Sequence, residues 1–342
     1  MVSPLPAAEL DEVLTATAGA DWEDLRGARV LLTGGTGFFG IWLASTLAWA
    51  NRKLGLGLCL HIVARRPERL VELAPHLRGD TSITLVPGDV RSLDVDGPFT
   101  HVVHAATPST PSAAEATVAA TVSTIVDGAR RLLDIAASAG VRRFLFTSSG
   151  AVYGTQPSEM THVSESYPGA PDPLEPRSAY GEAKRLAELL CAAEARNGVV
   201  PATIARCFTF VGPHLPLDAH FAIGNFVRDG LAGRSIVVQG DGSPRRSYLY
   251  ATDLMTWLLG VLVRGAPGRA YNVGSEREVS IAELARAVGS HFRVPVEIRG
   301  VAVPEAKPLR YVPSTQRARE ELGLVERVPL DAAIERIARW HS

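Results

Sequence analysis

Tyr180 and Lys184 are the pair whose residue types and spacing most clearly suggest chemistry. Residues four apart lie on one face of a helix, so the Lys184 ammonium can sit near the Tyr180 phenol and favour its phenolate form. Only three lysines, Lys53, Lys184 and Lys307, occur among the 35 basic residues. A compact ammonium can bond ribose hydroxyls and tune a phenol together, which a guanidinium does poorly. The alternative is an exposed helix pair without a chemical role.

A serine pair, Ser148-Ser149, lies at the end of a predicted strand that begins at Arg142. In a parallel sheet, ligands bind at the carboxyl edge, where such a pair would lie. Ser149 is therefore a candidate third member of a catalytic set with Tyr180 and Lys184. Taken alone, the two serines would be a helix cap or a turn.

A glycine-rich loop follows the first predicted strand, Val30–Thr33, and opens a helix. In a dinucleotide site, glycines allow a tight turn and a close approach of the backbone to the pyrophosphate, which lies at the helix N-terminus. The alternative is a tight turn without a ligand. The candidate cofactor residues of this loop are Gly34, Thr36, Gly37, Phe38, Phe39 and Gly40.

Two arginines, Arg65 and Arg66, follow the second predicted strand, where an NAD enzyme usually carries Asp or Glu. Arginine there suits a 2′-phosphate, so the sequence favours NADP over NAD. The alternative is that both arginines only solvate a loop.

Residues at the ends of the next two predicted strands complete the candidate cofactor site. Asp89 can approach the adenine amino group, and Val90 can cover the ring. His101 and His104 are three apart on a strand and face opposite sides, so no metal site is predicted. Small residues after the fourth strand would let the backbone approach the cofactor: Ala105, Ala106 and Thr107.

Short apolar runs alternate with amphipathic helical stretches, as in βαβ units. The sequence thus predicts an α/β fold, a Rossmann doubly wound parallel sheet with a smaller C-terminal substrate lobe. We expect the NAD(P)-binding domain over residues 1–212, with a returning strand at 270–273, and the substrate lobe mostly over 213–342. A capping box, Ser280 to Glu283, predicts a helix start in the lobe. Seven strands are predicted, at 30–33, 58–64, 82–86, 100–104, 142–148, 202–208 and 270–273.

The composition limits the classes of protein to which this chain can belong. The 342 residues carry a net charge of −1 and are 46% hydrophobic, which is ordinary for globular proteins and argues against nucleic-acid binding. Cys59, Cys191 and Cys207 are widely spaced, which argues against disulfides and favours a reducing cytoplasm. The longest apolar run, 254–263, is too short for a membrane span.

Several ordered motifs resemble the extended short-chain dehydrogenase/reductase family, in particular its nucleotide-sugar epimerases and dehydratases. The resemblance covers nearly the whole chain. The motifs are Thr33-Gly-Gly-Thr-Gly-Phe-Phe-Gly40, Gly88-Asp-Val90, His104-Ala-Ala106, Thr147-Ser-Ser-Gly-Ala-Val-Tyr-Gly154, Tyr180-x-x-x-Lys184, Arg206-Cys-Phe-Thr-Phe-Val-Gly-Pro213 and Gly240-Asp-Gly-Ser-Pro-Arg-Arg246.

The resemblance implies a role for each matched residue. Tyr180 would be the catalytic acid/base, Lys184 would bind the nicotinamide ribose, and Ser149 would bond the reacting oxygen. Thr147 and Phe208 would contact the cofactor. The groups implied for the substrate, besides Ser149, are Thr209, Asn225, Arg246 and Arg310.

Three positions depart from the family pattern. Thr209 stands where the family often has Asn, and Ser247 where it often has Asp. Ala151, beside Gly150, stands where sugar dehydratases and uronate decarboxylases carry an acidic residue. These two positions therefore carry no ionisable side chain that could supply the extra acid that elimination chemistry requires.

The leading hypothesis is an NAD(P)-dependent nucleotide-sugar epimerase that acts through a transient keto-sugar. The alternatives are an NADPH-dependent keto-sugar or carbonyl reductase, a nucleotide-sugar dehydratase, and a non-catalytic NADP-binding sensor. We expect a cytoplasmic enzyme with a nucleotide-sugar substrate and no metal, nucleic-acid or membrane partner. Helices predicted at 112–139 and 178–197 would form a four-helix homodimer contact of the kind seen in the family.

Overall fold

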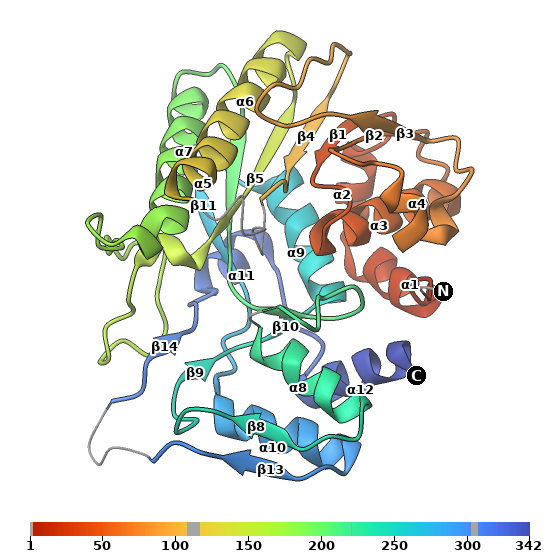
Figure 1. The fold of residues 1–342 in the computed structure, drawn as a ribbon. Coiled ribbons are helices and arrows are strands. Elements are labelled where there is room, and N and C mark those ends of the chain that lie inside the picture. The colour runs from red at the N-terminus through yellow and green to blue at the C-terminus, as the bar shows by residue number, and fades with distance from the viewer. Residues whose placement is uncertain (1–2, 108–116, 220, 302–306) are drawn as a thin grey trace.

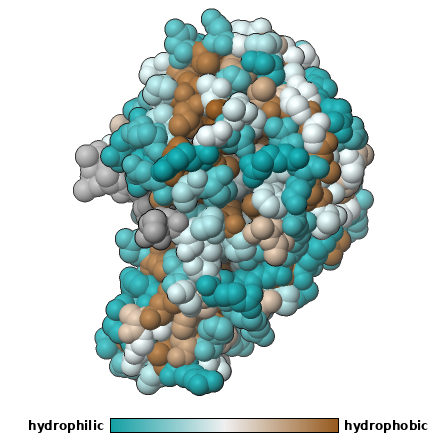
Figure 2. Space-filling view, turned by 90° about the vertical axis from the view of Figure 1, so that its right-hand side faces the viewer, coloured by the Kyte–Doolittle hydropathy of each residue, from teal (hydrophilic) through white to brown (hydrophobic). Residues whose placement is uncertain are grey.

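The computed structural model describes residues 3–107, 117–219, 221–301 and 307–342. A large body contains the main sheet between layers of helices, and a smaller lobe lies below it (Figure 1). Hydrophilic side chains cover much of the face in Figure 2, with apolar patches between them. Among the described residues, no helix combines the length and apolarity that crossing a membrane requires.

The central sheet has seven strands in the order β11-β6-β5-β4-β1-β2-β3, and every neighbouring pair is parallel. This confirms the predicted Rossmann-like α/β fold. Most predicted bounds hold to within one residue. The strands are β1 Arg29–Thr33, β2 Cys59–Ala64, β3 Ile83–Pro87, β4 His101–His104, β5 Arg143–Ser149, β6 Ala202–Cys207 and β11 Ala270–Val273.

Helices cover both faces of this sheet because its inner strands are apolar on both sides. One core packs α3 (Phe38–Leu54) and α9 (Ala251–Arg264) on the sheet, with Trp42 and Trp257 buried in it. The opposite core packs α6 (Gly128–Ala139) and α7 (Ala179–Arg196). The shorter α4 spans Arg69–Leu73.

The helix predicted over 112–139 differs in the structure. Residues 112–116 lie outside the described residues. Beyond them α5 (Val118–Val122) runs into a π-helical turn at Ser123–Asp127 before α6 begins. Two helices that the sequence analysis did not predict precede β1, namely α1 (Ala7–Ala16) and α2 (Gly19–Asp24).

The smaller lobe has its own apolar core between short strands and three helices. The predicted capping box is present, since Ser280 Oγ accepts from Glu283 N and Glu283 Oε2 accepts from Ser280 N. The helices of this core are α8 (Ala222–Leu231), α10 (Ile281–Phe292) and α12 (Leu330–His341).

Short strands outside the central sheet form two two-stranded sheets and one three-stranded sheet. The strands are β7 (Phe210–Val211), β8 (Ile236–Val238), β9 (Arg245–Arg246), β10 (Leu249–Tyr250), β12 (Val279–Ser280), β13 (Val296–Ile298) and β14 (Arg310–Tyr311), and α11 spans Gln316–Leu322. In the three-stranded sheet β12-β9-β14, Tyr311 pairs with Arg246.

Candidate active site

The glycine loop joins the carboxyl end of β1 to α3. Gly34 has φ of 76°, and a Cβ there would lie 2.5 Å from the carbonyl oxygen of Ala105. A Cβ at Gly40 would lie 2.2 Å from the carbonyl oxygen of Gly34. Gly37 precedes α3 without a side-chain cap, so the first amides of that helix are available to an anion. This tight turn at a helix start fits a dinucleotide pyrophosphate.

The other loop residues serve mainly in packing. The Phe39 ring meets Phe210 edge-on, with centroids 5.2 Å apart, and lies 5.8 Å from the Phe38 ring. Thr36 is half-buried at the turn. These contacts anchor the loop to the body and leave its backbone as the part that can approach a phosphate.

The carboxyl ends of β2 and β3 carry the predicted adenosine contacts. Arg65 and Arg66 are exposed directly after β2, close to the glycine loop because Gly34 N donates to Val63 O. Asp89 accepts two hydrogen bonds from the Arg91 guanidinium, which hold the pKa of its carboxyl below the usual value. Val90 is buried.

The end of β4 lies beside β1. The Thr33 hydroxyl hydrogen-bonds His104 Nδ1 at 2.8 Å, and Ala105, Ala106 and Thr107 follow. His104 is buried, which lowers its pKa to about 3. His101 instead contacts Asp24, so the two histidines do not share a site. In the described ranges, no group of three or more His, Cys, Asp or Glu residues could hold a metal ion.

Ser149, Tyr180 and Lys184 come together at the carboxyl edge of β5. Ser149 is the last residue of that strand, and Tyr180 and Lys184 lie one turn apart at the start of α7. Burial raises the pKa of Tyr180 to about 12, against an opposing hydrogen bond from Ser149. The structure thus brings the three predicted residues into one cluster.

Lys184 differs from the expected arrangement. Its ammonium donates to the carbonyl oxygen of Thr147 at 2.6 Å and to the Thr107 hydroxyl at 2.8 Å. Its Nζ lies 5.9 Å from the Tyr180 ring centroid. Burial lowers the pKa of Lys184 to about 8.

Ser148, Glu188 and Arg206 form a buried hydrogen-bonded group, the Glu188 brace, which was not predicted. Glu188 accepts hydrogen bonds from the Ser148 hydroxyl and from the Arg206 guanidinium, at 2.5 and 2.7 Å. Tyr180, Lys184 and Glu188 follow at intervals of four, which could have indicated that all three share one helix face. The brace fixes α7 against β5 and β6.

Tyr311 is a further polar residue of the site that the sequence analysis missed. Its hydroxyl lies 3.4 Å from Ser149 Oγ, and its ring packs on Phe208 with centroids 4.8 Å apart. The strand β14 that carries it has only two residues, so no periodic pattern could have indicated it. Phe208, expected at the cofactor, therefore contacts an active-site residue.

The predicted substrate residues differ in their surroundings. The Arg246 guanidinium lies 5.9 Å from the Tyr311 ring centroid, close to the catalytic cluster. Arg310, on the same strand as Tyr311, pairs with Glu278 at 3.1 Å. Asn225 lines a pocket between α8 and β8, and the carbonyl oxygen of Thr209 accepts from Leu249 N.

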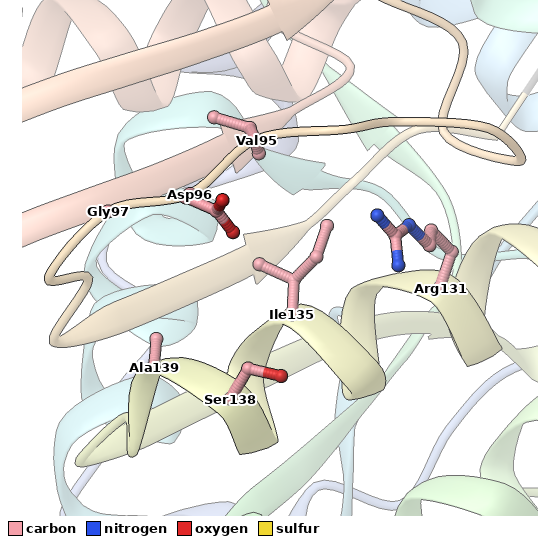
Figure 3. Close-up of a pocket in the computed structure, with 7 residues that line it drawn as sticks. All are labelled: Val95, Asp96, Gly97, Arg131, Ile135, Ser138 and Ala139. Atoms are coloured by element: carbon pink, nitrogen blue, oxygen red, sulfur yellow. The ribbon is translucent and has the colours of Figure 1, made fainter.

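A second pocket lies between α6 and the segment that precedes β4 (Figure 3). Arg131 and Ile135 project into it from the helix, opposite Asp96. None of the predicted site residues lines it. We do not assign it to the active site.

Comparisons with known proteins decide the family. The model of the NAD dependent epimerase/dehydratase family matches residues 30–274. The chain belongs to this family. It is therefore an enzyme of a class that includes epimerases and dehydratases.

Curated relatives extend the similarity over most of the chain. UDP-glucuronic acid decarboxylase 6 of Arabidopsis thaliana is 31% identical over 306 residues, which cover 88% of this chain and 85% of the relative. UDP-glucuronic acid decarboxylase 1 of Xenopus tropicalis is 29% identical over 315 residues, which cover 91% of this chain and 72% of the relative. The family is thus supported independently of its model.

Solved structures agree on the fold. DesIV, a dTDP-glucose 4,6-dehydratase from Streptomyces venezuelae with NAD and TYD bound, matches with a TM-score of 0.76 and 27% identity. The match covers 92% of this chain and 96% of DesIV. UDP-glucose 4-epimerase from Thermotoga maritima matches with the same TM-score at 20% identity, covering 92% and 98%. The second likeness shows the fold alone.

Proposed function

We propose that this enzyme is an NAD(P)-dependent nucleotide-sugar epimerase that acts through a transient keto-sugar. The observation that carries the proposal is the cluster of Ser149, Tyr180 and Lys184 beside the glycine loop, with Gly150 and Ala151 in the place of acidic residues. Such a site can move one proton and one hydride at a hydroxyl-bearing carbon, and positions 150 and 151 supply no carboxyl for elimination. The mass of the product formed from nucleotide sugars tests this proposal.

A nicotinamide bound at this site would supply reversible hydride acceptance. Tyr180, as phenolate, would take the proton of the sugar hydroxyl, and Ser149 would donate a hydrogen bond to the oxygen as it becomes a carbonyl. Lys184 would contribute a buried positive charge that favours the phenolate, and hydrogen bonds to the Thr147 carbonyl and the Thr107 hydroxyl hold its ammonium in place. The proton returns from Tyr180 when the ketone is reduced on its other face.

Two features support a nucleotide-sugar substrate. Arg246 and Arg310 offer planar guanidinium groups for a diphosphate at the junction of body and lobe. The pocket that Asn225 lines, between α8 and β8, is where we place the nucleoside. Thr209, which the family resemblance assigns to the substrate, would meet the sugar. The named relatives act on UDP-glucuronic acid, and DesIV acts on dTDP-glucose.

Two other reactions remain as candidates. The decarboxylase relatives and the dehydratase neighbour favour chemistry that continues beyond the ketone. Arg65 and Arg66 favour a reductase that consumes NADPH. Both alternatives share the first oxidation or reduction step at Ser149 and Tyr180, and their products differ in mass from an epimer.

NADP preference is part of the proposal, because exposed guanidinium groups follow β2 where an acidic residue would repel a 2′-phosphate. NADP should raise the melting temperature more than NAD at equal concentration, since the tighter ligand stabilises the folded state further. Thermal melts of the protein with each cofactor measure this. In a matched variant, Arg65→Ala with Arg66→Ala, we expect the two shifts to become equal. A larger shift with NAD for the unaltered enzyme would contradict the preference.

We also propose a cytoplasmic homodimer. Exposed apolar side chains on α5 and α7, namely Val118, Leu186 and Leu189, give these helices a surface that a second copy could cover. The three cysteines are unpaired, as in a reducing compartment. Sedimentation equilibrium measures the oligomeric state directly.

A further inference from the structure

Tyr311 lies in the space that Gly150 leaves open next to Ser149. A Cβ at Gly150 would lie 2.7 Å from the Tyr311 hydroxyl oxygen and 2.7 Å from Phe208 Cε1. These distances are too short for real Cβ contacts, so a larger residue at 150 would displace the phenol. The chain thus combines a glycine directly after Ser149 with a phenol from a distant strand.

The Ser149 hydroxyl has one proton to donate and two lone pairs to accept with. One lone pair already accepts from Ala151 N at 3.1 Å. The Tyr311 oxygen also lies within reach, at 3.4 Å. Either hydroxyl could donate in this pair. A phenol is a stronger acid than a serine hydroxyl, and burial keeps Tyr311 protonated by raising its pKa, which favours Tyr311 as the donor.

We propose that Tyr311 is a positioning residue that donates to Ser149 and thereby directs the Ser149 proton toward Tyr180 and the reacting oxygen. With both lone pairs occupied, the only hydrogen bond that Ser149 can add is the one it donates. The inference rests on the proposed role of Ser149 at the reacting oxygen, and it holds for the epimerase, reductase and dehydratase reactions alike.

Two contacts hold the Tyr311 ring in position. Phe208 packs on it from the end of β6, and the Arg246 guanidinium lies over it from the paired strand β9. A donor with a fixed ring adds little conformational freedom to the site. Replacing the hydroxyl alone, as in Tyr311→Phe, therefore removes the hydrogen bond while preserving the packing.

The test compares Tyr311→Phe, Ser149→Ala and the double variant. We expect Tyr311→Phe to lower turnover about tenfold, with the KM values for cofactor and sugar little changed. Ser149→Ala should lower turnover further, and the double variant should match Ser149→Ala because Tyr311 acts through Ser149. Tyr167→Phe, which removes a phenol of the same hydrophobic cluster, is the control and should keep normal turnover.

A second readout needs no substrate. In the NAD complex, a rapid pH jump followed at 295 nm measures tyrosine ionisation, and the Tyr180 contribution is the part that Tyr180→Phe removes. Both Tyr311→Phe and Ser149→Ala should move the midpoint of Tyr180 ionisation to higher pH, because the hydrogen bond from Ser149 to the phenolate is weakened in the first variant and absent in the second. If no nucleotide sugar is turned over, the proposed function fails while this measurement still decides the role of Tyr311.

Three results would overturn the role: additive losses in the double variant, a Tyr180 midpoint that only Ser149→Ala moves, or unchanged turnover in Tyr311→Phe. If Tyr311→Phe does not fold, Gly150→Ala replaces it, since its Cβ displaces the phenol. The same upward shift of the Tyr180 midpoint is then expected. An unshifted midpoint in Gly150→Ala would contradict the proposal.

Discussion

Tyr180→Phe should lower turnover by about 10²–10⁴-fold and leave cofactor affinity nearly unchanged. The substitution removes the hydroxyl that accepts and returns the substrate proton, while the ring still packs against the core on the α6 and α7 side of the sheet. Steady-state kinetics with the substrate identified from the panel below would give turnover, and fluorescence titration with NADH would give cofactor affinity.

The control for this prediction is Tyr167→Phe, because Tyr167 packs near Tyr153 and outside the catalytic cluster. Its turnover should stay within about twofold of the unaltered enzyme. Near-normal turnover in Tyr180→Phe would remove this phenol from the mechanism and favour a cofactor-binding sensor instead.

Gly40→Ala should weaken cofactor binding by about 10–100-fold. The new Cβ would lie 2.2 Å from the carbonyl oxygen of Gly34 and 2.5 Å from Gly35 Cα. Both are backbone atoms of the loop, so the loop must shift away from the position that suits a pyrophosphate. Equilibrium titration with NAD and NADP would measure the loss.

Gly19→Ala is the matched control for Gly40→Ala. Gly19 also lies near a helix start, and nothing lies within 4 Å of a Cβ there. This variant should bind cofactor normally. Unchanged affinity in Gly40→Ala would show that the cofactor does not use this loop.

The sequence predicted the central sheet well because its strands are continuous apolar runs separated by amphipathic helices. Ser149 was expected just after a strand ending at 148, and the structure ends β5 at Ser149 itself. The helix start at Ser280 was also predicted correctly, since a capping box is a local signal. Local patterns of this kind can be read without knowing the tertiary fold.

The parts that the sequence did not reveal depend on contacts between distant segments. Tyr311 reaches Ser149 from a two-residue strand, across a separation of 162 residues. The position of the Lys184 ammonium depends on the Thr107 hydroxyl, which follows β4, and on the Thr147 carbonyl, which lies in β5. Spacing placed Lys184 and Tyr180 on one helix face but could not determine which partners the ammonium would bond.

The central claim is epimerisation, and the most direct test is the mass and isotope content of the product. The purified enzyme would be incubated with a panel of UDP- and dTDP-sugars carrying deuterium at the carbon that is oxidised, and the products analysed by mass spectrometry. The proposal predicts an isomer of unchanged mass that retains the deuterium, with no net consumption of NAD(P)H. A product lighter by one water or by carbon dioxide, or one heavier by two hydrogens with matching loss of NADPH, would contradict it.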